Sequence, residues 1–265
     1  MSTKILRSTY NEKESLLWSG ERTMDHASGI WGRSILFQYL KSKITRKDVL
    51  VDLGCGAGYP SHYLTKYVGE GGKVFGYDNS KILIDIAKEY YRNQKNLLFI
   101  KQDITKKLPL KSDVVDCFVS FMLIQNLRGI EINKLLKEIK RCLKHTGYAV
   151  FLTIHPQIFE SEWKLDFIQY SKKKILEWRK NKQNNLLIKG FVKNSTGGKK
   201  SVFMYSHSKK QIESLLENNK LKMVDDVPIY VDQKTGSEFF GQKRNRKYPT
   251  TPIFWIFSIM KTAKV

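Results

Sequence analysis

The segment VDLGCGAGYP, residues Val51–Pro60, decides how this chain folds. Its three glycines, Gly54, Gly56 and Gly58, directly follow a short apolar run that ends in VLV. A glycine-rich turn after such a run is typical of the first strand-to-helix connection of an α/β sheet, where ligands bind beyond the carboxyl ends of the strands. The turn could receive a phosphate, a dinucleotide or a ligand without phosphate.

The spacing of the glycines disfavours phosphate recognition. The dinucleotide fingerprint G-x-G-x-x-G would require its third glycine at Tyr59 or at Ser61, and neither is glycine. A P-loop requires Gly-Lys followed by Ser or Thr, and the segment GAGYPSH contains no lysine. A ligand without phosphate therefore fits the turn best.

Short apolar segments on both sides of the turn alternate with helical patterns. This alternation predicts a parallel sheet with helices on both faces. The predicted strands are DVLVDLG (48–54), GKVFGYDNS (72–80), NLLFIKQDI (96–104), VVDCFVSFM (114–122), YAVFLTIH (148–155), LKMVDDVPIYV (221–231) and PIFWIFSIMK (252–261).

Helices are predicted where apolar residues recur every three or four positions. Residues 33–42 form one such segment, and Asn79 or Ser80 can cap a second, which buries Ile82, Ile86 and Tyr90. A third helix buries Ile132, Leu135, Leu136, Ile139 and Leu143 and ends at Gly147, and a fourth begins with a capping box at Ser208 and Gln211 and buries Ile212, Leu215 and Leu216.

The regular pattern fails over residues 156–205, which are rich in lysine, asparagine and aromatic residues. We interpret this stretch as an insertion that covers the sheet of a single domain, residues 1–265. The parts of that domain are an N-terminal helical lid (1–45), a ligand-binding core (46–155), the insertion (156–205) and the C-terminal part of the core (206–265).

Composition indicates a soluble protein with a full hydrophobic core, because 41% of the residues are apolar and no apolar run reaches the length of a membrane span. The start of the chain has no apolar stretch like a signal peptide's, so we expect a cytoplasmic protein. Cys55, Cys117 and Cys142 are widely spaced, which predicts small buried residues rather than disulfides or a metal site.

The glycine turn is followed by an acid at the end of the second predicted strand, Asp78, and another at the end of the third, Asp103. This order resembles the class I S-adenosylmethionine-dependent methyltransferases, over residues 48–154 and again over 205–265. The resemblance implies a Rossmann-like sheet that is mostly parallel with an antiparallel last strand. It also implies S-adenosyl-L-methionine as the cofactor.

Carried over residue by residue, the resemblance implies a cofactor site at the strand ends. The turn lies under the amino-acid and ribose parts of the cofactor, the second-strand acid binds the ribose hydroxyls, and the third-strand acid binds the adenine. The implied residues are Asp52, Gly54, Cys55, Gly56 and Gly58 in the turn, Asp78 with Asn79, Asp103 with Ile104, and Ser120, Phe121 and Gln125 along the fourth strand.

A structural role is the alternative for each of these residues taken singly. A tight strand-to-helix turn needs glycine without any ligand, Asp78 with Asn79 and Ser80 could cap a helix, and Asp103 could be an exposed turn residue. The glycine turn, Asp78 and Asp103 follow three successive predicted strands, and this combination favours the cofactor site over three separate structural roles.

Methyl transfer needs a general base only if the acceptor atom carries a proton. His155, at the end of the fifth strand, is the first candidate, with a structural role in the turn before Pro156 as the alternative, and His26 in the lid is the second. Aromatic residues of the lid and the insertion are candidate substrate contacts, namely Tyr10, Trp18, Trp31, Phe159 and Trp163.

The acceptor class is open between a small molecule and RNA. Aromatic residues among lysines suit a small anionic metabolite, whereas the net charge of +22 and the basic clusters at 172–174, 179–182 and 243–247 suit RNA. We favour a small-molecule methyltransferase that acts on a nitrogen or oxygen atom, because the charge is spread over the whole chain. A tRNA methyltransferase and a catalytically silent partner subunit are the alternatives.

Overall fold

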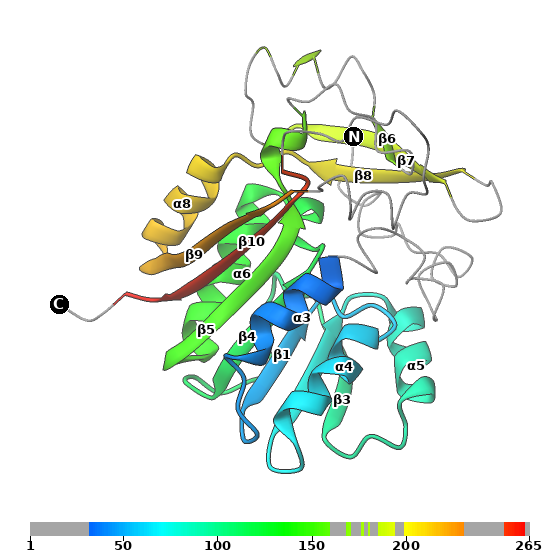
Figure 1. Ribbon diagram of the computed structural model, residues 1–265, viewed down its shortest axis with the longest axis vertical. Coiled ribbons are helices and arrows are strands. Elements are labelled where there is room, and N and C mark those ends of the chain that lie inside the picture. The colour runs from blue at the N-terminus through cyan, green and yellow to red at the C-terminus, as the bar shows by residue number, and fades with distance from the viewer. Residues whose placement is uncertain are drawn as a thin grey trace.

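The structure is a computed structural model that describes residues 32–159, 168–170, 176–177, 180, 185–193, 199–230 and 252–262. These residues form a seven-stranded sheet with helices on its two faces and a separate three-stranded sheet (Figure 1). His26, Tyr10, Trp18, Trp31 and Trp163, which the sequence suggested as site residues, lie outside the described residues.

The seven-stranded sheet has the order β3-β2-β1-β4-β5-β10-β9, so β1, which leads into the glycine turn, lies inside the sheet between β2 and β4. Strands β1 to β5 run parallel, and β10 pairs antiparallel with β5 and with β9, which confirms the predicted fold class. The strands are β1 (Val49–Leu53), β2 (Lys73–Asp78), β3 (Leu97–Lys101), β4 (Val115–Phe121), β5 (Leu143–Ile154), β9 (Leu221–Ile229) and β10 (Phe254–Lys261).

Helices cover both faces of this sheet, as predicted. One face packs on α3 (Arg33–Lys41), α4 (Tyr59–Val68) and α5 (Lys81–Tyr90), and the other on α6 (Gly129–Cys142) and α8 (Lys209–Asn218). Two hydrophobic layers result, with Leu36, Leu64 and Ile84 in the first and Ile132, Leu216 and Trp255 in the second. Of the helices that the structure describes, none combines the length and hydropathy needed to cross a membrane.

The helix starts follow from capping side chains at the expected positions. Ser80 Oγ accepts a hydrogen bond from the Leu83 amide at 3.3 Å, and Ser208 Oγ accepts one from the Gln211 amide at 3.1 Å. These bonds satisfy amides that have no partner within the helix. At the start of α6, Glu131 Oε2 accepts a hydrogen bond from the Arg128 amide at 2.9 Å, and the Glu131 amide donates to the Arg128 carbonyl at 2.8 Å.

Two details of the helix predictions are wrong. In α5 the buried residues are Leu83, Ile84 and Ala87, whereas Tyr90 is 70% exposed. Apolar residues occur on two adjacent faces of this helix. The prediction from periodicity chose the face with Ile82 and Ile86, which is less buried than the face with Leu83, Ile84 and Ala87. Helix α6 ends at Cys142, and Leu143 already begins β5, because the chain turns back into the sheet well before Gly147.

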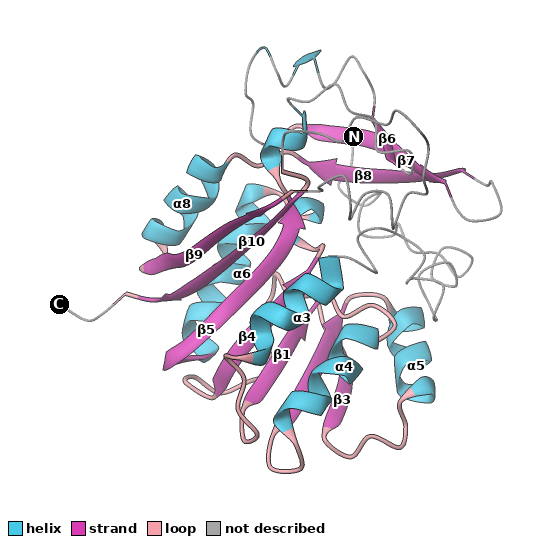
Figure 2. Ribbon diagram, viewed as in Figure 1, coloured by secondary structure: helices cyan, strands magenta, loops and turns pink. Residues whose placement is uncertain are grey.

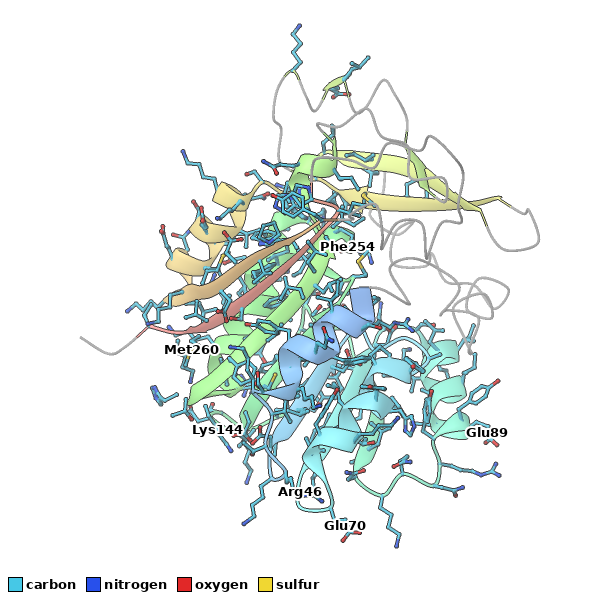
Figure 3. All side chains as sticks on the ribbon, viewed as in Figure 1. Arg46, Glu70, Glu89, Lys144, Phe254 and Met260 are labelled. Carbon is cyan, nitrogen blue, oxygen red and sulfur yellow. The ribbon has the colours of Figure 1, made fainter. Side chains whose placement is uncertain are left out.

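The predicted insertion contains the three-stranded antiparallel sheet, which we call the cap sheet: β6 (Ile168–Tyr170), β7 (Leu187–Lys193) and β8 (Lys199–Tyr205). Figure 2 shows it beside the carboxyl ends of β4 and β5. Figure 3 labels Phe254 and Met260 at opposite ends of β10, with Phe254 at the end near the cap sheet. Two short 3₁₀ helices follow β4 and β5, namely η3 (Ile124–Asn126) and η4 (Pro156–Phe159).

Candidate functional site

The glycine turn joins β1 to α4 and lies against the end of β2. The amides of Gly54 and Cys55 both donate to the Tyr77 carbonyl, at 2.8 and 3.0 Å. A side chain at Gly58 would overlap Phe99, since an added Cβ would lie 2.5 Å from its Cζ, but at Gly56 an added Cβ would have no neighbour within 4 Å. Gly58 is therefore required by packing, whereas Gly56 borders open space.

Asp78, the last residue of β2, holds this turn through its carboxylate. Its Oδ2 accepts a hydrogen bond from the Gly56 amide at 3.0 Å, and its Oδ1 accepts one from the Ser80 amide at 2.8 Å. Burial raises the pKa of Asp78, and the amide hydrogen bonds oppose the rise. Asp78 thus lies in direct contact with the glycine turn.

Asp52 is fully buried beneath the same turn. Its Oδ2 accepts a hydrogen bond from the Ser61 hydroxyl at 2.6 Å, and its Oδ1 has no partner among the described residues. Burial raises the pKa of Asp52 to about 7; the Ser61 hydrogen bond and the charge of Arg33 oppose this rise, and the charge of Asp78 adds to it. A buried acceptor atom without a partner is costly, so this atom points to a missing donor.

The raised pKa of Asp52 predicts how the stability of the ligand-free protein depends on pH. Between pH 4 and 7 the folded protein holds a proton on Asp52 that the unfolded chain releases, so the free energy of unfolding falls as the pH rises. The fall is about 1.4 kcal/mol per pH unit. Asp52→Asn should flatten this part of the profile in urea denaturation at several pH values. Parallel profiles for the two proteins would contradict the prediction.

Arg33 is a site residue that the sequence analysis missed. Its guanidinium carbon lies 5.2 Å from the centre of the Tyr59 ring and 5.0 Å from that of Phe121. Burial lowers the pKa of Arg33, and the charges of Tyr59 and Asp52 oppose the shift. The order of the elements indicates this position. Helix α3 leads into the first residue of β1, so the start of the helix, at Arg33, lies toward the carboxyl ends of the strands.

The third and fourth strands bring the remaining predicted cofactor residues to the same edge. Asp103 Oδ1 accepts hydrogen bonds from the amide and the hydroxyl of Thr105, and Ile104 beside it is buried. Ser120 pairs in register with Leu53 of β1, and its hydroxyl is buried without a partner among the described residues. Asn79 is exposed next to Asp78.

His155 lies at the carboxyl end of β5, on the side of β10. Its Nδ1 accepts a hydrogen bond from the Gln157 amide at 3.2 Å, and its ring meets that of Trp255 edge-on at 6.0 Å. Phe159 ends the short helix η4 that follows. The residues gathered around the glycine turn come from β1, β2, β4 and α3, whereas His155 follows β5, which lies between β4 and β10 in the sheet.

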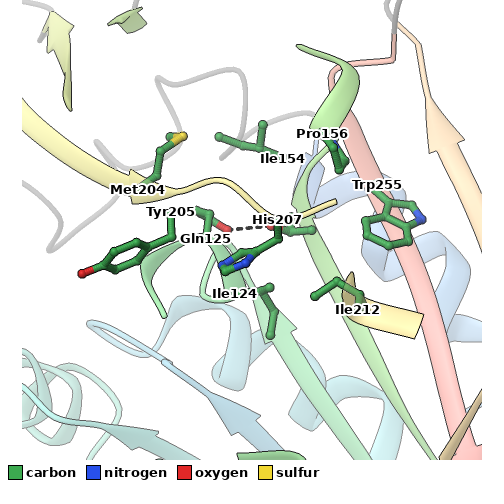
Figure 4. A pocket seen from close by; sticks show the side chains of 10 residues that line it. Ile124, Gln125, Ile154, Pro156, Met204, Tyr205, His207, Ile212 and Trp255 are labelled. Carbon is green, nitrogen blue, oxygen red and sulfur yellow. Dashed lines mark hydrogen bonds between the residues drawn. The ribbon is translucent and has the colours of Figure 1, made fainter. Parts of the chain in front are cut away.

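A second polar cluster joins the cap sheet to the seven-stranded sheet. His207 contacts the Leu127 carbonyl through Nε2 at 2.7 Å and Gln211 through Nδ1 at 3.1 Å, and burial lowers its pKa. His207 and Gln125 line a cavity of about 20 Å³ (Figure 4). Such a volume is close to that of one water molecule.

The three cysteines are free and buried, as the sequence predicted. Burial raises the pKa of each thiol, for Cys142 to about 11. No group of three or more potential metal ligands occurs in the part of the chain that the structure describes.

A family model for a methyltransferase domain matches residues 51–151 of this chain. The chain is 32% identical over 111 residues to a 2-phytyl-1,4-naphtoquinone methyltransferase of Synechococcus elongatus, which covers 41% of this chain and 46% of that protein. It is 27% identical over 119 residues to an arsenite methyltransferase of Mus musculus, which covers 41% of this chain and 31% of that protein. The matched part thus spans less than half of either relative.

The fold extends this similarity beyond the matched segment. The solved structure of an S-adenosylmethionine-dependent methyltransferase from Clostridium acetobutylicum superposes with a TM-score of 0.61 at 14% identity and covers 95% of this chain and 98% of that one. At this identity the superposition establishes the fold alone. Together, the methyltransferase-domain match over residues 51–151, the sheet order and the glycine turn with its two acids support a class I S-adenosylmethionine-dependent methyltransferase.

Proposed function

We propose that this chain transfers the methyl group of S-adenosylmethionine to a nitrogen or oxygen atom of a small molecule. The observation that carries the proposal is the open space beside Gly56, bordered by a turn whose amide is held by Asp78. The ligand-free fold has room for a Cβ at residue 56. A side chain there would occupy the space that we assign to the cofactor.

The charges below the turn suit the amino-acid end of the cofactor. That end carries an ammonium group and a carboxylate. Asp52 offers the ammonium group a buried Oδ1 without a partner, and Arg33 offers the carboxylate a guanidinium held between two aromatic rings. Opposite charges in a buried site recognise such a zwitterion more strongly than they would in water.

The acids at the next two strand ends suit the adenosine. Asp78 can accept two hydrogen bonds from the ribose diol, and Asp103 with the buried Ile104 would flank the adenine. The buried hydroxyl of Ser120 is a further donor at this edge.

The bound cofactor supplies a methyl group on a sulfonium, which an acceptor lone pair can attack in line. The chain then has to align the acceptor, exclude water and remove a proton where the acceptor carries one. We propose His155 as the base for such an acceptor and keep His26 as the second candidate. The buried cysteines have raised pKa values, so attack by the acceptor itself is favoured over a thiolate intermediate.

A small-molecule acceptor is supported by the names of the two relatives, a 2-phytyl-1,4-naphtoquinone methyltransferase and an arsenite methyltransferase. The predicted contacts Tyr10, Trp18, Trp31, Phe159 and Trp163 would form the acceptor pocket. The basic clusters would then add only to the general positive surface.

Labelled S-adenosylmethionine distinguishes the acceptor classes. The purified chain is incubated with a small-molecule extract and, separately, with total RNA, and the product fractions are counted. We expect label in small molecules and none in RNA. Label in RNA that disappears when Lys172, Lys173 and Lys174 are replaced together by alanine would identify an RNA methyltransferase, and label in neither fraction despite cofactor binding would favour a silent partner subunit.

A further inference from the structure

Met122, the first residue after β4, has a backbone conformation that residues other than glycine rarely adopt. Its φ is 54°, in the left-handed region. For a residue other than glycine this conformation is strained and persists only where the surroundings enforce it. Strain of this kind gathers at functional sites, and β4 ends beside the glycine turn.

Hydrogen bonds on both sides of the residue hold Met122 in place. Its amide donates to the Leu152 carbonyl at 2.8 Å, and its carbonyl accepts from Gln125 Nε2 at 2.7 Å and from Asn126 Nδ2 at 3.2 Å. Asn126 is exposed, so its bond competes with water, whereas Gln125 is only 8% exposed. The bond from Gln125 is therefore the stronger restraint.

Gln125 is itself fixed at its other end. The hydroxyl of Thr153, on β5, donates to Gln125 Oε1 at 2.7 Å, and Thr153 is 4% exposed (Figure 4). Both polar ends of the Gln125 amide are thus engaged by the protein. The side chain acts as a rigid link from β5 to the Met122 carbonyl.

The residues on either side of Met122 form two walls of the candidate cofactor site. Phe121 lies 5.0 Å from the guanidinium carbon of Arg33, and Leu123 Cδ1 lies 2.9 Å from the position that a Cβ on Gly54 would occupy. A change in the backbone of Met122 would move both walls, because they are its immediate neighbours in the chain.

We propose that Gln125 is a positioning residue, which holds Met122 in its strained conformation and thereby sets the walls formed by Phe121 and Leu123. The inference rests on the proposed function and assigns Gln125 a role without contact to the cofactor. The family resemblance implied instead that Gln125 is one of the residues that line the cofactor site.

Calorimetric titration with S-adenosylhomocysteine tests this role. Gln125→Ala should weaken binding about tenfold, because the Met122 carbonyl loses its stronger restraint and the walls formed by Phe121 and Leu123 shift. The matched control is Asn219→Ala, which removes another buried amide that donates two hydrogen bonds, to Asn133 and to the Leu215 carbonyl, far from the site. Both variants should lose thermal stability, and the control should bind as the unmodified chain does.

A second substitution asks whether Gln125 acts through the backbone of Met122. Glycine adopts positive φ freely, so Met122→Gly added to Gln125→Ala should recover most of the lost affinity. Equal affinities for Gln125→Ala and the unmodified chain, or no recovery in the double variant, would overturn the inference. An unmodified chain that fails to bind would instead count against the proposed function.

Discussion

Replacing Gly56 by valine should abolish cofactor binding while leaving the protein folded. An added Cβ at this position has no neighbouring protein atom within 4 Å, so we expect the valine side chain to extend into the space proposed for the cofactor. We expect the affinity for S-adenosylhomocysteine to fall by about 100-fold or more, equivalent to roughly 3 kcal/mol. The φ of 56° adds a cost to folding of about 1–2 kcal/mol for a non-glycine residue. Calorimetry and urea denaturation measure the two effects separately.

Gly69→Val is a control for a loss of stability away from the site, since the ψ of −166° at Gly69 belongs to a backbone conformation that almost only glycine adopts. Gly69 has a φ of 55°, it lies at the opposite end of α4, and the nearest atom to an added Cβ is the flexible tip of Arg46 at 3.0 Å. This variant should lose stability yet bind normally. If Gly56→Val retained the affinity of the unmodified chain, the space beside Gly56 could not be the cofactor site.

Asp78→Ala should have an effect of similar size on binding. It removes the acceptor for the Gly56 and Ser80 amides, which fixes the turn, and it removes the carboxylate proposed to bind the ribose diol. Hydrogen bonds to a charged group are worth about 1.5–3 kcal/mol each, so losing two predicts a decrease in affinity of about 100-fold or more. Titration with S-adenosylhomocysteine gives the value.

Asp78→Asn separates the two roles of this carboxylate. The amide oxygen of asparagine can still accept the Gly56 hydrogen bond, but its NH2 group then faces the Ser80 amide and cannot accept from it or from the ribose. We therefore expect Asn to recover part of the thermal stability lost in Asp78→Ala and less of the affinity. Normal affinity in Asp78→Ala would remove Asp78 from the site.

The fold was predictable because local patterns and global topology agree. The residues of β1 and β4 are almost continuously apolar, as expected for strands with both faces covered, and β1 stops at a glycine where the turn begins. The buried face of α5 was mispredicted because Leu83 and Ile84 compete with Ile82 and Ile86, and periodicity alone does not decide between adjacent apolar faces.

Parts of the candidate site were predictable where the type of a residue and its place at a strand end indicate its chemical role. Acids at successive strand ends were visible in the sequence, and Asp78 does contact the glycine turn. The order of the elements places Arg33 near the site, but its chemistry there could not be predicted, because it depends on the rings of Tyr59 and Phe121, which only the folded chain brings together. The strained backbone of Met122 could not be predicted either, because a methionine in the sequence does not indicate a positive φ.

Calorimetric titration of the unmodified chain with S-adenosylhomocysteine, with NAD measured in parallel, tests the central claim most directly. The glycine spacing, the open space beside Gly56 and the opposite charges of Asp52 and Arg33 predict saturable binding of one S-adenosylhomocysteine per chain and no binding of NAD. A folded chain that binds NAD, or that gives no binding heat with S-adenosylhomocysteine at any temperature tested, would contradict the assignment of this site.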